Sequence, residues 1–296
     1  MYDQELIENL FGEEVLEYLK NKNRGGANNQ KGNTYENVFT VYQIALQAKK
    51  VLETHQKVLV ASQTLAFVDD LILDHTEEDF RQHHQLKNSP TVYWGTGNKS
   101  IADDFNKQHK INQELGIKSE IKLVLSSPEL YAKLSASIPN YIQPFTQVCH
   151  FHYETSLTRL LLKESGLVEA IKYLCYTENP PKDKIEYVLK ALLGAWEGCD
   201  KSNTSILEIL KEAKNVSPSY IRCFTDNAQI DPQVELILAG IEGLKYINSR
   251  GFLILEYEEL DYRELEYDCT TEAFKRFQQR VINSKPQTFD ELVQLC

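Results

Sequence analysis

The sequence predicts an α/β domain followed by a mostly helical domain. Strand-like segments alternate with helical patterns up to residue 155, and the later part carries amphipathic helices without a repeat of fixed period. A segment with two prolines, residues 178–183, is the best linker candidate. We therefore expect an α/β domain at residues 1–178 and a mostly helical domain, for partner binding or oligomerisation, at residues 179–296.

The expected elements follow one another in a simple order. Apolar residues recur at helical spacing over residues 34–49, and two strands of a hairpin follow at 67–74 and 80–87. A helix is expected at 98–112 and a buried strand at 121–127. The next helix starts at Pro128, because proline is favourable in the first turn. The remaining expected elements are a strand at 148–153 and helices at 155–163, 168–175, 185–196, 205–213, 218–224 and 232–247.

The composition indicates a folded chain outside the membrane. The chain has 296 residues, of which 42% are hydrophobic, and this is enough for a substantial core. It has no apolar run of about 18 residues and its N-terminus is acidic, so we expect a cytoplasmic protein without a membrane span or leader. The six cysteines are widely spaced with no C-x-x-C pair, which disfavours a cysteine zinc site and a disulfide framework.

Polar residues in the expected hairpin indicate a metal-dependent hydrolytic site. Side chains alternate along a strand and rise by roughly 3.3 Å per residue, so Gln85 and Lys87 share a face about 6.6 Å apart. Leu86 then faces the core. We expect Asp70 to meet the Gln85 and Lys87 pair across the hairpin. Asp69 points to the opposite face unless a β-bulge exchanges the two acids, so it is the reserve metal ligand.

These residue types suit the hydrolysis of a phosphodiester. The reaction needs an oxygen-ligated divalent cation, a nearby water and positive charge beside the phosphorus. Asp70 is a hard anionic ligand of the kind that Mg²⁺ prefers, with Mn²⁺ as a substitute, and Gln85 offers an amide oxygen or holds a metal-bound water. Lys87 would orient the attacking water. Glu36 either complements a helix dipole in a first turn or is a further metal ligand.

An ordered set of motifs carries a resemblance to a known nuclease family. Arg24-Gly-Gly26 precedes Gln30-Lys-Gly-Asn-Thr-Tyr-Glu36, and Val68-Asp-Asp70 and Gln85-Leu-Lys87 follow. This order resembles the double-stranded-DNA endonuclease domain of antiphage defence effectors, which occurs in CBASS nuclease effectors and in the nuclease subunit of Lamassu-type systems. The domain is a branch of the PD-(D/E)xK superfamily, and the resemblance covers approximately residues 20–160.

The resemblance implies a fold, an activity and partners. It implies a restriction-endonuclease-like mixed-sheet core that cuts double-stranded DNA with Mg²⁺, in which Glu36, Asp70, Gln85 and Lys87 have the metal-binding and catalytic roles. It also implies an ATPase or sensor subunit of a defence complex as a partner. Gln85 departs from the pattern, because the broader superfamily usually has Glu at this position, and the change removes one anionic ligand.

The charge of the chain sets a condition on DNA binding. The net charge is −11, and residues 1–155 hold 15 Lys or Arg and 20 Asp or Glu. Proteins that grip duplex DNA alone usually carry a basic footprint, so we expect delivery to DNA by a partner or by homo-oligomerisation. Lys99, Lys107 and Lys110 are candidate phosphate contacts, with a solvated helix face as the alternative interpretation.

Two further patterns carry weaker interpretations. The segment Gly95-Thr-Gly-Asn-Lys-Ser100 is too short for a Walker motif, although its backbone N–H groups and Lys99 suit a DNA phosphate. His150 and His152 share a strand face, but the sequence indicates no third ligand nearby, so a structural role is the main interpretation.

The C-terminal half shows no catalytic constellation. Residues 256–268 hold seven acids interleaved with Tyr257, Leu260, Tyr262, Leu265 and Tyr267. This stretch is expected to be a solvated face, or to dock on a basic partner. The alternative function for the whole chain is a non-catalytic interaction subunit on a nuclease-like fold, which bridges an ATPase sensor to other components.

Overall fold

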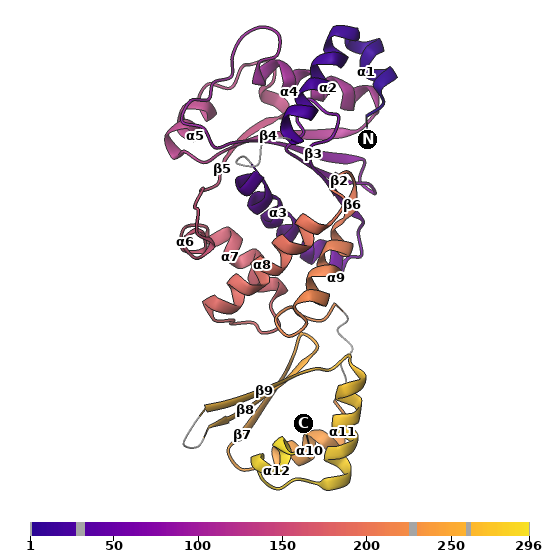
Figure 1. The fold of residues 1–296 in the computed structure, drawn as a ribbon, viewed down its shortest axis with the longest axis vertical. Helices are drawn as coiled ribbons and strands as arrows, with labels where there is room; N and C mark the ends of the chain where they lie inside the picture. The colour runs from indigo at the N-terminus through magenta and orange to yellow at the C-terminus, as the bar shows by residue number, and fades with distance from the viewer. Residues whose placement is uncertain (1, 28–32, 225–229, 259–261, 296) are drawn as a thin grey trace. The chain divides into compact units, whose positions relative to one another are not determined.

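The computed structural model describes residues 2–27, 33–224, 230–258 and 262–295 (Figure 1). The chain forms two compact units. Unit 1 comprises Met1–Ile171 and Leu192–Glu212, and unit 2 comprises Lys172–Ala191 and Ala213–Cys296. The sequence predicts one boundary at residue 178, whereas the chain passes between the units after residues 171, 191 and 212. Among the described helices, none is long and apolar enough to cross a membrane.

A six-stranded mixed sheet forms the centre of unit 1, so the α/β prediction is confirmed. The strand order is β5-β4-β3-β2-β1-β6, in which β3, β4 and β5 are parallel and the other pairs are antiparallel. The strands are β1 (Val58–Ala61), β2 (Leu71–His75), β3 (Phe80–Lys87), β4 (Lys118–Leu125), β5 (Thr146–His150) and β6 (Thr204–Ser205).

Helices cover both faces of this sheet. Figure 1 shows α1, α2 and α4 on one face and α3 on the other. The helices of unit 1 are α1 (Gln4–Phe11), α2 (Glu13–Ala27), α3 (Asn33–Glu53), α4 (Ile101–Glu114), α5 (Pro128–Ser135) and α6 (Leu157–Lys163), with a 3-10 turn at Gln143–Phe145. Three helices pass between the units, namely α7 (Ser165–Leu174), α8 (Lys182–Gly198) and α9 (Ile206–Val216).

The alternation of side chains along β3 explains the two covered faces. The His83 ring lies within hydrogen-bonding distance of Tyr2 Oη and of the Asn112 amide, at 3.0 and 3.2 Å, so it faces the layer of α1 and α4. The next residue, His84, packs its ring edge-on against Phe39 of α3. Successive residues of a strand point to opposite faces, so the sheet is buried on both sides here.

The expected strand at 67–74 is partly wrong, because β2 begins only at Leu71. The preceding residues form a loop held by a side chain from α4. Gln108 Oε1 accepts hydrogen bonds from the backbone N–H of Phe67 at 3.0 Å and of Val68 at 3.3 Å. These N–H groups are therefore not available to a sheet ladder. The β3 strand lies at the expected residues 80–87, and it pairs with β2 in the expected hairpin.

Unit 2 contains an antiparallel sheet that the sequence does not predict. The sheet has the order β7-β8-β9, with β7 (Leu244–Ser249), β8 (Phe252–Glu258) and β9 (Tyr262–Asp268). Its helices are α10 (Pro232–Ala239), α11 (Glu272–Ser284) and α12 (Phe289–Val293). The expected helix at 232–247 therefore ends at Ala239, and the expectation of an essentially helical C-terminal domain is corrected to one that combines helices with a sheet.

The acid-rich stretch at 256–268 follows the two-residue period of a strand. In β9, Leu265 and Tyr267 pack into the core that α11 supplies with Phe274 and Phe277. The alternate residues Glu264 and Glu266 lie on the other face, where the Tyr176 hydroxyl donates to Glu264 Oε1 at 3.4 Å. Apolar and acidic residues thus separate onto two faces of the sheet. Residues 259–261 lie outside the described part of the chain.

This arrangement predicts that Glu266→Gln stabilises the protein at high pH only. Burial, followed by the neighbouring Glu264, raises the pKa of Glu266 to about 7. The folded chain then binds this proton more tightly than the unfolded chain, so stability falls as the pH rises from about 4.5 to about 7. Glutamine resembles the protonated form, and we expect a gain on the order of 1 kcal/mol at pH 8, after allowing for solvent screening, and almost none at pH 5.

Urea denaturation of the full chain at the two pH values measures this difference. Glu242→Gln, which changes an exposed acid of the same unit, is the matched control and is expected to show little change at either pH. An equal effect of Glu266→Gln at pH 5 and pH 8 would contradict the assignment.

Candidate functional site

The hairpin brings Asp70 to the C-terminal end of β3, as the sequence predicts. Asp70 Oδ2 accepts hydrogen bonds from the Gln85 amide Nε2 and from the Leu86 backbone N–H, the latter at 2.7 Å. Lys87 Nζ lies 4.0 Å from the same oxygen. Leu86 is buried, with 4% of its surface exposed, and Asp70 and Lys87 are partly exposed. The site therefore opens to solvent on the side of Lys87.

Gln85 has a positioning role in this geometry. Its amide nitrogen donates to Asp70, and its side chain is buried. The contact fixes the carboxylate that the sequence assigns to the metal. That Gln85 itself supplies an oxygen ligand stays a prediction.

Glu36 joins the same group of charges from the other layer of the fold. It lies in the first turn of α3, as expected. Burial, and then the negative charge of Asp70, raise the pKa of Glu36 to about 7, against the opposing effect of the Lys87 ammonium. Burial alone raises the pKa of a carboxyl group, and a second acid nearby adds to this effect. Glu36 therefore lies within electrostatic range of Asp70 and Lys87.

Asp69 contacts Lys22 of α2, whereas Asp70 contacts Gln85 and Leu86 of β3. Since residues 67–70 form a loop and not a strand, the alternation rule does not apply to them. Asp69 is buried, and its Oδ1 lies 3.8 Å from Lys22 Nζ. Burial raises the pKa of Asp69, and Asp70 raises it further, whereas Lys22 and Lys87 lower it.

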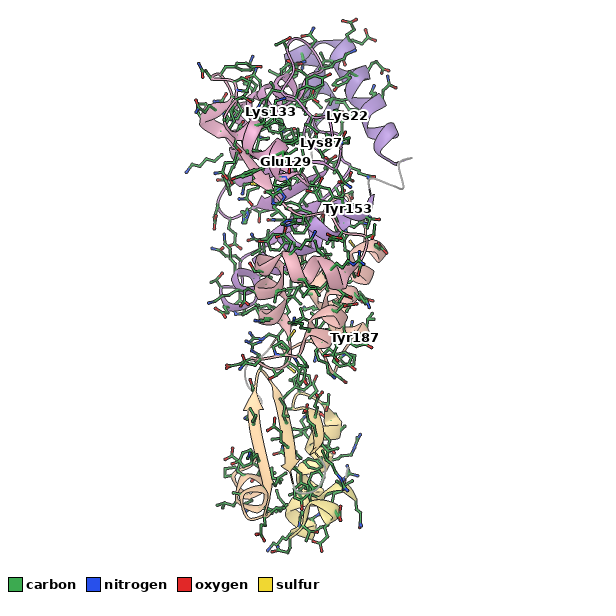
Figure 2. All side chains as sticks on the ribbon, turned by 90° about the vertical axis from the view of Figure 1, so that its left-hand side faces the viewer. Lys22, Lys87, Glu129, Lys133, Tyr153 and Tyr187 are labelled. Carbon is green, nitrogen blue, oxygen red and sulfur yellow. The ribbon has the colours of Figure 1, made fainter. Side chains whose placement is uncertain are left out.

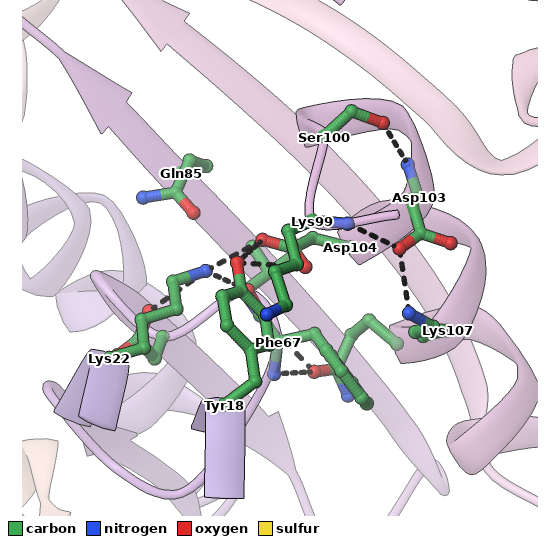
Figure 3. A network of polar contacts seen from close by, with 12 residues as sticks. Tyr18, Lys22, Phe67, Gln85, Lys99, Ser100, Asp103, Asp104 and Lys107 are labelled. Carbon is green, nitrogen blue, oxygen red and sulfur yellow. Dashed lines mark hydrogen bonds and ion pairs between the residues drawn. The ribbon is translucent and has the colours of Figure 1, made fainter. Parts of the chain in front are cut away.

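The sequence gives no sign of Lys22, which extends this network from α2 (Figure 3). Its Nζ forms ion pairs with Asp104 Oδ2 at 3.0 Å and with Asp69, and it donates to the Phe67 carbonyl. The Tyr18 hydroxyl donates to Asp104 Oδ2 at 3.2 Å. Burial disfavours the ammonium, but Asp104 and Asp69 outweigh this, and the pKa of Lys22 is raised. Lys22 and Asp104 lie 82 residues apart in sequence, so only the fold pairs them.

A groove of about 1000 Å³ leads from Lys87 across the same surface. Its basic side chains are Lys87, Lys99 and Lys133, and among the described residues that line it none is acidic. Tyr93 lies in the lining with 72% of its surface exposed. Figure 2 labels Lys87 and Lys133 in this part of the chain. The acidic protein therefore carries a positively charged groove next to its cluster of carboxylates.

The three lysines proposed as phosphate contacts have different surroundings. Lys99 is exposed and lines the groove, with its Nζ 5.2 Å from the centre of the Tyr18 ring. Lys107 forms an ion pair of 2.6 Å with Asp103, and Lys110 is exposed but does not line the groove.

The start of α4 uses its own side chains as caps. The Asp103 carboxylate accepts the N–H of Lys99, and the Ser100 hydroxyl accepts the N–H of Asp103. These two N–H groups are therefore already bonded within the protein, so a phosphate at the start of this helix would have to displace them or rely on Lys99.

Part of the motif that carries the family resemblance cannot be placed. Residues 30–32 lie outside the described part of the chain, and Arg24-Gly-Gly26 forms the last turns of α2. The motif therefore rests on Glu36, the two aspartates, Gln85 and Lys87.

A second group of ligand-type side chains lies at the end of β5. Donor atoms of His150, His152 and Glu164 lie within 4.8 Å of one another. The two histidines are apparent from the sequence, but Glu164, which ends α6, is not. The third ligand that the sequence did not indicate is thus Glu164, 12 residues after His152.

The donor set at Asp70 fits a hard divalent cation. Glu36, Asp69 and Asp70 carry carboxyl groups within electrostatic range of one another, and Lys22 lies 3.8 Å from Asp69 and Lys87 4.0 Å from Asp70. Mutual repulsion in a partly buried site is relieved either by protonation or by a bound cation, and carboxylates suit Mg²⁺ and Mn²⁺. The residues present are therefore chemically suitable for the expected metal.

Comparisons with known proteins give no match: no family model, curated protein or solved structure is similar to the chain.

The network at Lys22 predicts that Lys22→Met destabilises the protein. The change leaves Asp104 and Asp69 partly buried without their shared counter-charge, and we expect a loss of about 2 kcal/mol, allowing for the partial exposure of Lys22. Thermal denaturation measures the effect. Lys20→Met is the matched control on the same helix, because Lys20 forms a surface ion pair with Glu17, and it is expected to shift the melting temperature little. Equal melting temperatures of the two variants would contradict this account of Lys22.

Proposed function

We propose that this chain is a metal-dependent endonuclease that cleaves double-stranded DNA, as the effector subunit of an antiphage defence complex. The observation that supports it most strongly is Asp70 held against Gln85 beside Lys87, at one end of a lysine-lined groove. Glu36 and Asp69 lie within electrostatic range of this pair. The family resemblance supports the choice of DNA and of a defence role.

The residues have separate tasks in the proposed reaction. When bound, Mg²⁺ or Mn²⁺ would supply positive charge at the phosphate and favour ionisation of water. Asp70, with Glu36 and Asp69, would hold the ion, while the Leu86 N–H and the Gln85 amide fix the direction of the Asp70 carboxylate. Lys87 is placed on the open side of this group, where its ammonium would orient the attacking water and stabilise charge developing on the phosphate.

The groove supplies the proposed route for the DNA backbone. Lys99 and Lys133 are exposed along it, and Tyr93 offers an exposed ring. Phosphate contacts by lysine are independent of base sequence and release counterions. Since the net charge of the chain is −11, long-range repulsion opposes binding to free DNA, and we propose that an ATPase or sensor subunit, or a second copy, delivers the enzyme to its substrate.

Plasmid cleavage with Mg²⁺ or Mn²⁺ tests the proposed function. We expect wild-type protein to cut, weakly when alone and strongly with the products of its neighbouring genes. Lys87→Ala and Asp70→Asn should each reduce the rate by roughly 10²–10³-fold, because each removes a group that acts on the developing charge or on the ion. EDTA should abolish cutting.

Lys118→Ala is the matched control for Lys87→Ala. Lys118 is an exposed lysine on the same sheet, and β4 places it beside Phe80, at the opposite end of β3 from Lys87. The control should cut like the wild type. The nuclease proposal is wrong if the folded wild-type protein, with its partners present, fails to cut with either Mg²⁺ or Mn²⁺. It is also wrong if Lys87→Ala cuts as fast as Lys118→Ala. Strong cleavage by the isolated chain would contradict only the gating by partners.

The groove predicts a defined salt dependence of DNA binding. In an Asp70→Asn background with EDTA, which prevents cutting, Lys99→Ala with Lys133→Ala should weaken binding of duplex DNA equally for all sequences. It should also lower the slope of log affinity against log salt by about 2, or about 1 per lysine. Fluorescence anisotropy measures both quantities. The double control Lys57→Ala with Lys118→Ala removes the same charge from exposed positions outside the groove lining. Equal slopes for the two double variants would contradict this route.

A second candidate function is a non-catalytic interaction subunit that bridges an ATPase sensor to other components. The contact between Gln85 and Asp70 favours it, because an amide donates to the aspartate where the superfamily usually places another acidic ligand. The acidic face of β9 in unit 2 offers a surface for a basic partner. The plasmid assay separates the two functions, since a bridging subunit binds its partners but does not cut.

A further inference from the structure

The end of β5 carries a group of side chains that the proposed nuclease does not use. The histidines His150 and His152 are followed 12 residues later by Glu164, and the donor atoms of all three lie within 4.8 Å of one another. His152 Nδ1 lies 2.7 Å from Glu164 Oε1, and the rings of the two histidines are 4.4 Å apart between centroids. We propose that these three residues form a binding site for one Zn²⁺ ion.

The distances are close to those of a metal centre. With metal–nitrogen and metal–oxygen bonds of 2.0–2.1 Å, neighbouring ligand atoms of a tetrahedral site are about 3.3 Å apart. The His152 and Glu164 contact of 2.7 Å is a hydrogen bond, so the binding of Zn²⁺ would displace its proton and widen the pair by about 0.6 Å. The donor atom of His150 lies within 4.8 Å of the other two.

The surrounding contacts hold the ligands in place. His150 Nε2 lies 3.2 Å from the Ser126 carbonyl, which makes it a donor and leaves Nδ1 as the ligand atom. The His152 backbone N–H donates to Glu164 Oε1 at 2.6 Å. Between the histidines, the buried Phe151 accepts a hydrogen bond from Tyr35 through its carbonyl and donates through its N–H to Leu125. Ligands fixed in this manner lose little freedom on binding an ion.

The ligand types select the ion. Two imidazoles and one carboxylate suit Zn²⁺, whereas Mg²⁺ prefers oxygen ligands and keeps most of its water. The His152 side chain is 36% exposed, so the site is open to solvent on one side and a water can complete the tetrahedron. In register, His150 pairs with Leu125, which is the partner of Lys87. The zinc site therefore lies two strands, or roughly 10 Å, from the end of β3 and is separate from the carboxylate cluster.

Isothermal titration of metal-free full-length protein with ZnCl₂, in the presence of excess Mg²⁺, tests the proposal. We expect one Zn²⁺ per chain and a higher melting temperature with Zn²⁺ than without it. His152→Asn and Glu164→Gln should each weaken binding by at least about tenfold and remove the thermal shift. The melting temperature measured without metal shows whether each variant is folded. If one of the two variants is unfolded, His150→Asn is titrated in its place.

Three controls separate this site from other zinc ligands in the chain. Asp70→Asn should bind Zn²⁺ like the wild type, which keeps this test independent of the proposed nuclease. Cys149→Ser removes the neighbouring thiol, and His55→Asn removes an exposed histidine outside the cluster. Both should also retain binding. Absence of Zn²⁺ binding, or unchanged affinity in the folded His152→Asn and Glu164→Gln variants, would overturn the proposal.

Discussion

The hydrogen bonds that hold the Asp70 carboxylate against β3 determine the rest of the site. The Leu86 N–H belongs to the backbone of a central strand, so the position of Asp70 is as well fixed as the sheet itself. A negative charge held here changes the ionisation of the neighbouring carboxyl groups. Burial is the largest cause of the raised pKa values of Glu36 and Asp69, and the charge of Asp70 adds to it in both cases. The Lys87 ammonium lies 4.0 Å from Asp70. The fold therefore maintains a repulsive cluster that a cation would relieve.

Such a cluster is stable without an ion only if other groups compensate it. Lys22 is the main compensating charge within the protein, because it bridges Asp69 and Asp104 from α2. Its partners lie on the loop before β2 and on α4, so one side chain connects three elements. The stability of this layer and the electrostatics of the site are consequently linked.

Charge is distributed unevenly over this acidic chain. The groove beside Lys87 has basic residues and no acidic ones among its described lining, whereas acids line one face of β9 in unit 2. A protein with this distribution can bind a polyanion locally while its net charge limits unspecific binding to nucleic acid. The distribution agrees with an enzyme whose access to DNA depends on a partner.

Local sequence patterns were sufficient for some features and not for others. The positions of β3 and of Glu36 in the first turn of α3 follow from strand and helix periodicity. The predicted contact of Asp70 with Gln85 is present, but a loop and not a strand positions Asp70. The loop at 67–70 does not follow from periodicity, because Gln108, about 40 residues away, takes its N–H groups. Lys22 and Glu164 were missed for the same reason, since only the fold brings them to their partners.

The sheet of unit 2 is a different case. Its two-residue alternation is visible in the sequence at residues 262–268, and Glu264 is exposed on the acidic face as expected. The prediction of a solvated face did not include the burial of the strand's other face. Leu265 and Tyr267 place the other face of this strand in the core, because they pack against Phe274 and Phe277.

The most direct test of the central claim is the position of a bound ion. Crystals grown with Mn²⁺ would give an anomalous difference map in which we expect a peak between Glu36 and Asp70, within bonding distance of both carboxylates, and no such peak in Asp70→Asn. A map with no peak at this cluster at saturating Mn²⁺, in a protein folded as described here, would contradict the claim that the carboxylates form a metal site.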